Sequence, residues 1–253
     1  MQSEPFDFLR GAAGRAGRRL VPPRRQDEAA AEAVPLRALM APGGMRRSLD
    51  LCSGHAGSDP RALLSLWSRH YFHTLIPPVV VTSLLAFRRL PLAVAGAAVQ
   101  LDPQGFPVAV VLPHGGRPAP APEDPFRRFA ALADQHLAPL IAAWAAELRV
   151  APRLLWANAA GYFAWAVREA AAEDAEAARP GLAILAADHR PDGTPNPLRE
   201  PLRLVEGPHG PEPRRTVCCL LYRLPGRGEC GHCPLSRAAP RSGRPGGGGH
   251  GPT

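Results

Sequence analysis

The chain has 253 residues, 45% of them hydrophobic, which is enough to bury a substantial core as one large domain or two small ones. Its formal net charge is +8, and all 30 basic residues are arginine. A basic surface attracts nucleic acid, anionic lipid, an acidic protein or an anionic metal complex. No basic stretch is interleaved with aromatic residues in the way that stacks bases, so we predict no nucleic-acid partner.

Residues 1–50 hold Arg, Ala, Pro and Gly in irregular order, which predicts a disordered N-terminal extension. The first residues include the acidic Glu4 and lack a continuous apolar core, so we expect no secretory signal. The most apolar run, 75–87, is too short to span a bilayer. These features predict a cytoplasmic protein and leave open, as an alternative, peripheral contact with the inner face of the membrane.

Residues 51–200 carry the signals of a mainly helical body. Proline directly after a capping residue is typical of the first turn of a helix. Asp59-Pro60 and Asp124-Pro125 carry this signal and predict helices from Pro60 and Pro125. Further helices are predicted from Pro77 and Pro152, with a short helix over 181–187. The helix from Pro77 is expected to end near Arg89. The helix from Pro125 is expected to bend or break at Pro139 and to end near Arg149.

Two stretches indicate β-structure. The apolar stretches 94–101 and 106–112 flank Asp102-Pro103-Gln104-Gly105, a turn signal that predicts a hairpin near 93–112. A strand pair is expected over 202–206 and 216–222. The sequence thus predicts an α+β fold with a predominantly helical body, a small β-hairpin and a C-terminal cysteine-rich segment over 201–235. The tail 236–253, with four consecutive glycines, is predicted to be disordered.

The array of cysteines near the C-terminus is the most informative motif. Cys218 and Cys219 are adjacent, ten residues separate them from Cys230, and two more separate Cys230 from Cys233. Four thiolates in one segment suit a tetrahedral zinc or a small iron–sulfur cluster. Adjacent cysteines are unusual for zinc, and the spacing also departs from common ferredoxin patterns, so spacing alone supports the two centres about equally. A vicinal disulfide is a further alternative. The remaining Cys52 is interpreted as a buried or incidental thiol.

The residues around the array resemble a known family. The segment 214–222, together with Cys230-Gly231-His232-Cys233-Pro234, is similar to the C-terminal signature of the ferric siderophore reductases, the FhuF-like family. Three further blocks resemble the same family, at 67–78, 155–160 and 196–198. The resemblance covers roughly residues 58–235. It implies a [2Fe–2S] cluster held by Cys218, Cys219, Cys230 and Cys233.

The resemblance also implies an oxidoreductase that reduces Fe(III) in a siderophore complex by one electron and releases Fe(II) in the cytoplasm. The sequence has no glycine-rich phosphate loop and no G-x-G-x-x-G motif, so the electron is expected from a ferredoxin-like or flavin-containing donor protein. Two alternatives stand beside this one. The chain could be a structural-zinc interaction module, or an accessory of siderophore biosynthesis or transport without reductase activity.

Candidate site residues fall into two groups beyond the cysteines. Cations near the array would offset thiolate charge and raise the reduction potential of a cluster; the candidates are Arg214, Arg215, Arg223 and His232. Simple solvation of these side chains is the alternative. The candidates for a siderophore pocket are His70, Tyr71, Trp156 and Asn158. Core packing is the alternative for the tryptophan, and a bond to a neighbouring backbone group is the alternative for the asparagine. No catalytic residue is expected beyond the cluster.

Overall fold

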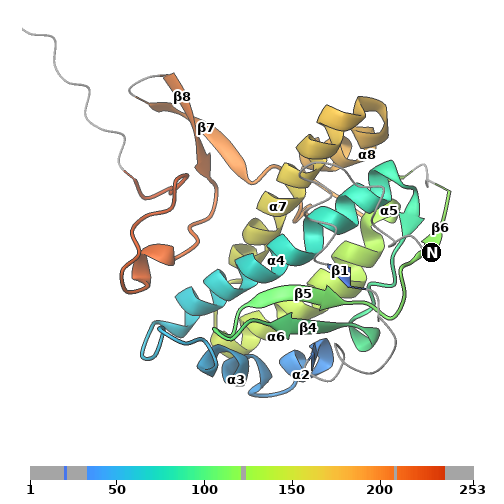
Figure 1. Ribbon diagram of the computed structural model, residues 1–253. Helices are drawn as coiled ribbons and strands as arrows, with labels where there is room; N and C mark the ends of the chain where they lie inside the picture. Colours follow the sequence, from blue (N-terminus) through green and yellow to red (C-terminus); the bar gives the residue numbers. More distant parts are fainter. Residues whose placement is uncertain (1–19, 22–32, 121–123, 208–209, 237–253) are drawn as a thin grey trace, which may run out of the picture.

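The computed structural model describes residues 20–21, 33–120, 124–207 and 210–236 (Figure 1). It confirms the α+β fold with a predominantly helical body. The helices are α2 (Leu36–Met40), α3 (Gly44–Asp50), α4 (Pro60–Leu85), α5 (Pro125–Leu132), α6 (Ala138–Leu148), α7 (Pro152–Glu173) and α8 (Ala175–Ala186). The strands are β1 (Leu20–Val21), β2 (Val34–Pro35), β3 (Arg88–Arg89), β4 (Ala98–Leu101), β5 (Pro107–Val111), β6 (Arg117–Pro118), β7 (Leu202–Gly207) and β8 (Gly210–Arg215). None of the described helices is long and apolar enough to cross a membrane.

Helix α4 is the central element of the body and packs along α7 (Figure 1). Its start is as predicted, because the Asp59 carboxylate accepts a hydrogen bond from the Arg61 amide at 3.0 Å and Pro60 follows the cap. The prediction of a separate helix from Pro77 is wrong, since α4 continues through both prolines to Leu85. Each proline inside a helix removes an N–H donor and crowds the preceding turn, at a cost of about 3 kcal/mol. The surrounding turns are almost entirely buried, and each buried Val, Leu or Ile contributes about 1.5–3 kcal/mol, so packing outweighs the lost bonds.

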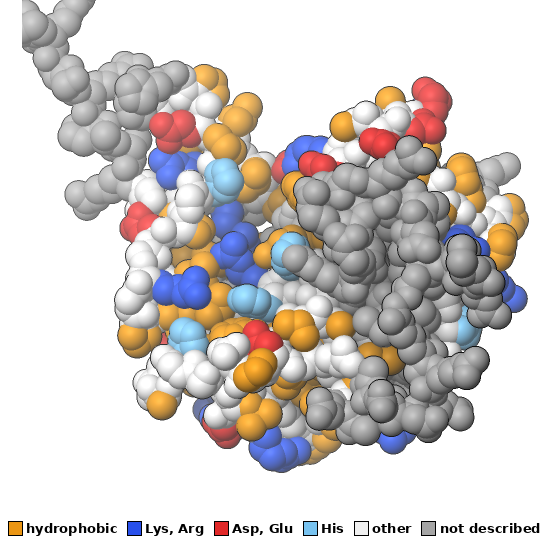
Figure 2. Space-filling view, viewed as in Figure 1, with side chains coloured by type: hydrophobic (Ala, Val, Ile, Leu, Met, Phe, Trp, Pro, Cys, Tyr) orange, Lys and Arg blue, Asp and Glu red, His pale blue; other side chains and the backbone are white. Residues whose placement is uncertain are grey.

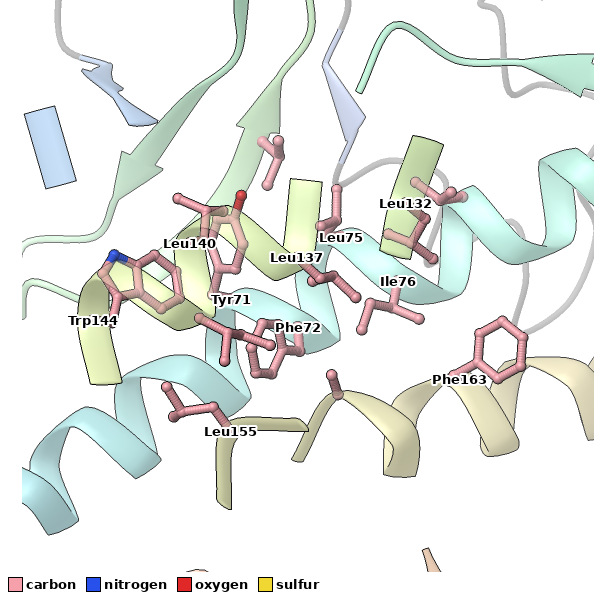
Figure 3. Close-up of a cluster of buried hydrophobic side chains, with 14 of the residues drawn as sticks. Tyr71, Phe72, Leu75, Ile76, Leu132, Leu137, Leu140, Trp144, Leu155 and Phe163 are labelled. Atoms are coloured by element: carbon pink, nitrogen blue, oxygen red, sulfur yellow. The ribbon is translucent and has the colours of Figure 1, made fainter. Parts of the chain in front are cut away.

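The core lies between α4, α6 and α7, where aromatic rings pack edge-to-face (Figure 3). Tyr71 is fully buried there, with its hydroxyl 2.6 Å from Nε2 of His136. The other ring nitrogen of His136 lies 2.5 Å from the Leu92 carbonyl, so Nδ1–H donates to that oxygen and Nε2 accepts from the tyrosine. Burial lowers the pKa of His136 to about 4, and the bond to Leu92 only partly opposes this. The prediction that Tyr71 lines a ligand pocket is wrong, because its side chain faces the core.

The helix predicted from Pro125 is interrupted by a π-helical turn before Pro139. Helix α5 ends at Leu132, a π-helical turn covers Ala133–Leu137, and α6 follows. Pro139 therefore falls in the first turn of α6, where its missing N–H costs little. The irregularity is the π-turn itself, and His136 belongs to it. Helix α8 also begins earlier than predicted, after the capping residue Asp174.

The predicted hairpin of β4 and β5 is confirmed, with the Asp102 carboxylate accepting from the amides of Gln104 and Phe106. Strands β1 and β2 extend it into a sheet of order β1-β5-β4-β2, in which β1 runs parallel to β5. The prediction of a disordered extension over 1–50 is wrong for residues 34–50. There β2 pairs with β4, and α2 and α3 bury apolar side chains in the core: Leu36, Leu39, Met45 and Leu49. Most of residues 1–32 and of the predicted tail lies outside the described residues.

The last strand pair lies apart from this sheet (Figure 1). β7 pairs with β8, so the second strand covers 210–215 and the prediction of a strand over 216–222 is wrong. Pro211 and Pro213 alternate along β8, which places their donor-less nitrogens on the unpaired edge of a two-stranded ribbon. The cysteine array follows directly after β8.

Candidate functional site: the cysteine segment

The four cysteines lie on loops rather than on a strand. After β8 the chain passes through Cys218 and Cys219 to Leu220, whose left-handed conformation (φ 59°) cannot continue a strand. A 3₁₀ turn over Leu221–Arg223 follows, and the chain returns through a tight turn in which the Cys233 amide donates to the Cys230 carbonyl at 2.9 Å. These two loops bring the two cysteine pairs together. We call residues 216–236 the cysteine segment.

All four thiols are free, and each vicinal cysteine interacts with one member of the second pair. Cys219 shares a hydrogen bond with Cys230, and Cys218 interacts electrostatically with Cys219 and Cys233. Backbone amides support two of the sulfurs, with Leu220 N 3.4 Å from Cys218 Sγ and Leu235 N 3.4 Å from Cys233 Sγ. These contacts link all four sulfurs.

Burial raises the pKa of the Cys218 thiol, and it raises that of Cys230 to about 11, with the bond to Cys219 adding to the rise. These thiols therefore carry protons at neutral pH, and a metal centre must displace them on binding. Across the described ranges, no three His, Cys, Asp or Glu side chains converge closely enough to hold a single ion. A [2Fe–2S] cluster takes four thiolate ligands, so the four linked cysteines fit that group.

Arg215 lies beside the sulfurs and interacts electrostatically with Cys219 and Cys230. Its Nη2 donates to Asn158 Oδ1 at 2.6 Å, and its Nε donates to the Val217 carbonyl at 3.2 Å. Burial lowers the pKa of Arg215, but a guanidinium stays charged at neutral pH. The structure thus places Arg215 directly beside the sulfurs, and Arg214 donates to the Cys233 carbonyl at 3.5 Å.

A second cation, Arg69 of α4, was not among the predicted site residues. Its Nη1 lies 3.9 Å from Cys219 Sγ, and its charge contributes to the lowered pKa of Arg215. Within the described residues neither arginine has a carboxylate partner. Arg69 and Cys219 are 150 positions apart, so only the fold joins them. The one signal in the sequence was the place of Arg69 in the family-like block 67–78.

Asn158 of α7 is buried and connects the cysteine segment to the helical body. Its Nδ2 donates to Ser65 Oγ at 3.0 Å and lies 3.3 Å from Ser68 Oγ, while its oxygen accepts from Arg215. A buried amide with these partners does not face a ligand. The prediction that Asn158 lines a siderophore pocket is therefore wrong, and its contact with Arg215 is the link between site and body.

The remaining predicted residues lie around the segment in other roles. Arg214 pairs with Glu212 at 2.7 Å, and Arg223 pairs at 2.7 Å with Asp59, the cap of α4. His232 has an exposed side chain, and its carbonyl accepts from the Arg215 amide at 2.8 Å.

The two other pocket candidates differ in their exposure. His70 is exposed and its ring packs 4.7 Å from that of Phe106, whereas Trp156 is half-buried against the core. Basic side chains gather between the cysteine segment and the body (Figure 2).

The comparisons with known proteins agree with this geometry. Residues 65–212 match the family described as ferric iron reductase FhuF-like transporter, and residues 215–235 match the FhuF 2Fe–2S C-terminal domain. The chain belongs to the FhuF-like family. A curated relative, the ferric siderophore reductase of Escherichia coli (strain K12), is 25% identical over 179 residues, which is 70% of this chain and 67% of the relative. The C-terminal match decides between zinc and iron–sulfur in favour of a [2Fe–2S] cluster, and the four cysteines of the array are those that this FhuF-like domain contains.

Proposed function

We propose that this FhuF-like protein reduces the iron of a ferric siderophore complex by one electron and releases Fe(II) in the cytoplasm. The observation that supports this most is the four-cysteine array with two arginines beside it, in a segment that matches the family's [2Fe–2S] domain. The name of the Escherichia coli relative supports the substrate class.

The residues that would hold the cluster are Cys218, Cys219, Cys230 and Cys233. When bound, the cluster supplies one-electron transfer at a potential set by its charge, hydrogen bonds and solvent exposure. The chain's own residues act on the potential through their charge. Arg215 and Arg69 place two positive charges beside four thiolates, which favours the more negative, reduced state and raises the potential.

Asn158 acts as a positioning residue for this charge. Its amide is held by Ser65 and Ser68 of α4, and its oxygen fixes the guanidinium of Arg215. Because the bonded groups are buried, the arginine cannot leave the sulfurs without losing its partner. The helical body therefore sets the position of the cation.

The chemistry at the substrate needs little else. Hydroxamate and catecholate siderophores hold Fe(III) through hard oxygen ligands. Fe(III) accepts one electron, and the resulting Fe(II), larger and less charged, binds these ligands much more weakly and leaves. No carbon bond breaks, so no general acid or base is required. A ferredoxin-like or flavin-containing donor protein would supply the electron.

The test begins with anaerobic purification, quantitation of iron, sulfide and zinc, and electron paramagnetic resonance before and after dithionite. We expect about two irons and two sulfides per chain, with a signal only after reduction. The reduced protein is then mixed with a ferric hydroxamate complex and a ferrous chelator, and about one Fe(II) per cluster should be trapped. One zinc without sulfide would overturn the cofactor assignment. A reducible cluster that releases no Fe(II) from hydroxamate or catecholate complexes would favour the accessory role.

A further inference from the structure

A cleft of about 550 Å³ is lined by residues of α5 and of the strands β3 and β6. These elements lie on the opposite side of the molecule from the cysteine segment (Figure 1). The apolar lining of the cleft includes Leu90, Leu92 and Ala131. Four arginines also line it: Arg89, Arg117, Arg127 and Arg128. No Asp or Glu of the described residues contributes to the lining. The cleft therefore combines an apolar wall with concentrated positive charge.

Among the described residues, none of these four guanidinium groups has a carboxylate within 4.0 Å. Other described arginines are unpaired as well, but these four share one cleft whose lining includes no acidic side chain of the described residues. Like charges gathered in a cleft with low-dielectric walls repel one another and attract anions. This concentration of charge makes the cleft suited to a negatively charged ligand.

Arg128 provides a second, independent observation. Its Nη2 is shielded from solvent and has no hydrogen-bond partner among the described residues. The guanidinium carbon lies 5.4 Å from the centre of the Phe87 ring, a cation–π distance that holds the group in place. A buried, charged donor without an acceptor is costly. An anion bound in the cleft that Arg128 lines would offset this cost through its charge.

Phe87 itself is held in an unusual conformation beside the cleft. Its φ is +49°, which is unfavourable for a bulky side chain, and its ring is 47% exposed. The Ala119 amide donates to its carbonyl at 2.9 Å and fixes this backbone. Phe87 lines a narrower neighbouring pocket, to which Arg89 and Arg128 of the cleft also contribute. The fold thus presents an aromatic ring next to the arginines.

We propose that this cleft binds a phosphate-bearing organic molecule, whose phosphate oxygens are taken by Arg89, Arg117, Arg127 and Arg128. Guanidinium groups bind phosphate through paired, charge-assisted hydrogen bonds. The volume is that of a site for an organic ligand and exceeds what a bare ion needs. Two sources present this chemistry, namely a soluble organic phosphate and the headgroup of an anionic phospholipid. The site is separate from the cysteine segment and independent of the proposed reductase activity.

The experiment uses the cluster-loaded protein at low ionic strength in two arms. One arm titrates glycerol 3-phosphate and inositol hexakisphosphate by calorimetry. The other measures co-sedimentation with mixed phosphatidylglycerol and phosphatidylcholine vesicles, against pure phosphatidylcholine vesicles. We expect binding in at least one arm, weakened about tenfold or more in the variant R117Q/R127Q. Both arginines are exposed and unpaired among the described residues, so this variant keeps its fold.

The matched control is R37Q/R153Q, which removes the same charge from exposed arginines of α2 and α7 and should leave binding unchanged. Asn tolerates a positive φ, so Phe87→Asn removes the ring without new strain. Weaker vesicle binding by this variant, with soluble phosphate binding unchanged, identifies the lipid headgroup as the source. Absence of binding in both arms overturns the proposal. Equal weakening by the two double variants also overturns it, since that result means general charge attraction.

Discussion

The helical body and the cysteine segment are held together by different forces. In the body, α4, α6 and α7 bury aromatic and aliphatic side chains on many sides, so no single contact is decisive. In the cysteine segment few side chains are buried, so its attachment combines a small apolar contact through Leu221 and Leu224 with individual polar contacts such as Arg215 to Asn158 and Arg223 to Asp59. Packing in the body absorbs two prolines within one helix. Substitutions can therefore disrupt the site and the body separately.

The largest expected effect comes from removing a proposed ligand. Cys219→Ser should abolish cluster loading and reduce Fe(II) release to background, because three thiolates do not complete the ligand set. The helical signal in circular dichroism should stay, because the body does not depend on the cluster. Cys52→Ala, which changes the thiol outside the array, is the matched control and should retain the visible spectrum. Loss of the cluster in both variants would contradict the separation.

Acid should weaken the body through His136. Its folded-state pKa of about 4 lies below the ordinary value of 6.5, so the unfolded chain binds more protons between these pH values. Its contribution to the free energy of unfolding is therefore fully present above pH 6.5 and falls, by up to about 3 kcal/mol, as pH drops to about 4. Urea unfolding between pH 4 and 6.5 measures how the free energy of unfolding changes with pH. His136→Gln should make this change smaller, and an unchanged pH dependence in that variant would refute the assignment.

The attachment of the cysteine segment to the helical body should depend on the Asn158 side chain. Asn158→Leu leaves the Arg215 guanidinium and two serines without their partner, at a cost of about 2 kcal/mol. The fraction of protein that keeps its cluster on dilution should fall as well, because Arg215 loses its hydrogen bond to residue 158. Asn158→Asp keeps an acceptor for Arg215 and should restore retention. If both variants hold the cluster as the parent does, the link is not what positions the segment.

The smallest effect concerns charge alone. Arg69→Gln removes a cation 3.9 Å from Cys219 Sγ and should lower the cluster's reduction potential. A partly exposed charge contributes about 1 kcal/mol, which corresponds to about 40 mV for a one-electron couple. Redox titration followed by electron paramagnetic resonance measures the shift. Arg153→Gln, an exposed arginine on α7, should leave the potential unchanged, and a rise in Arg69→Gln would contradict the electrostatic argument.

Local signals in the sequence predicted local structure well. Asp59-Pro60 begins a helix and Asp102–Gly105 turns a hairpin because the caps and turns are made by neighbouring residues. The cysteine array identified the cofactor together with the family resemblance. Where burial outweighs local preference, the predictions failed. Pro77 ends no helix, and residues 34–50 are ordered because their apolar side chains enter a core built by distant segments.

The surroundings of the array were the harder part to predict. Arg69 reaches Cys219 across 150 positions, and no spacing rule connects them. Tyr71 and Asn158 are polar side chains on apolar helices, a pattern that suits a ligand pocket and a satisfied core equally well. Only their partners, His136 and Arg215, distinguish the two, and these come from other elements.

Asp59 begins α4 and also receives Arg223 from the cysteine segment, 164 positions away. The same carboxylate accepts from the Arg61 amide in the first turn of the helix. Amide hydrogen exchange at the start of α4 therefore reports whether the cysteine segment is docked, and it can be read in the intact protein without a spectroscopic label.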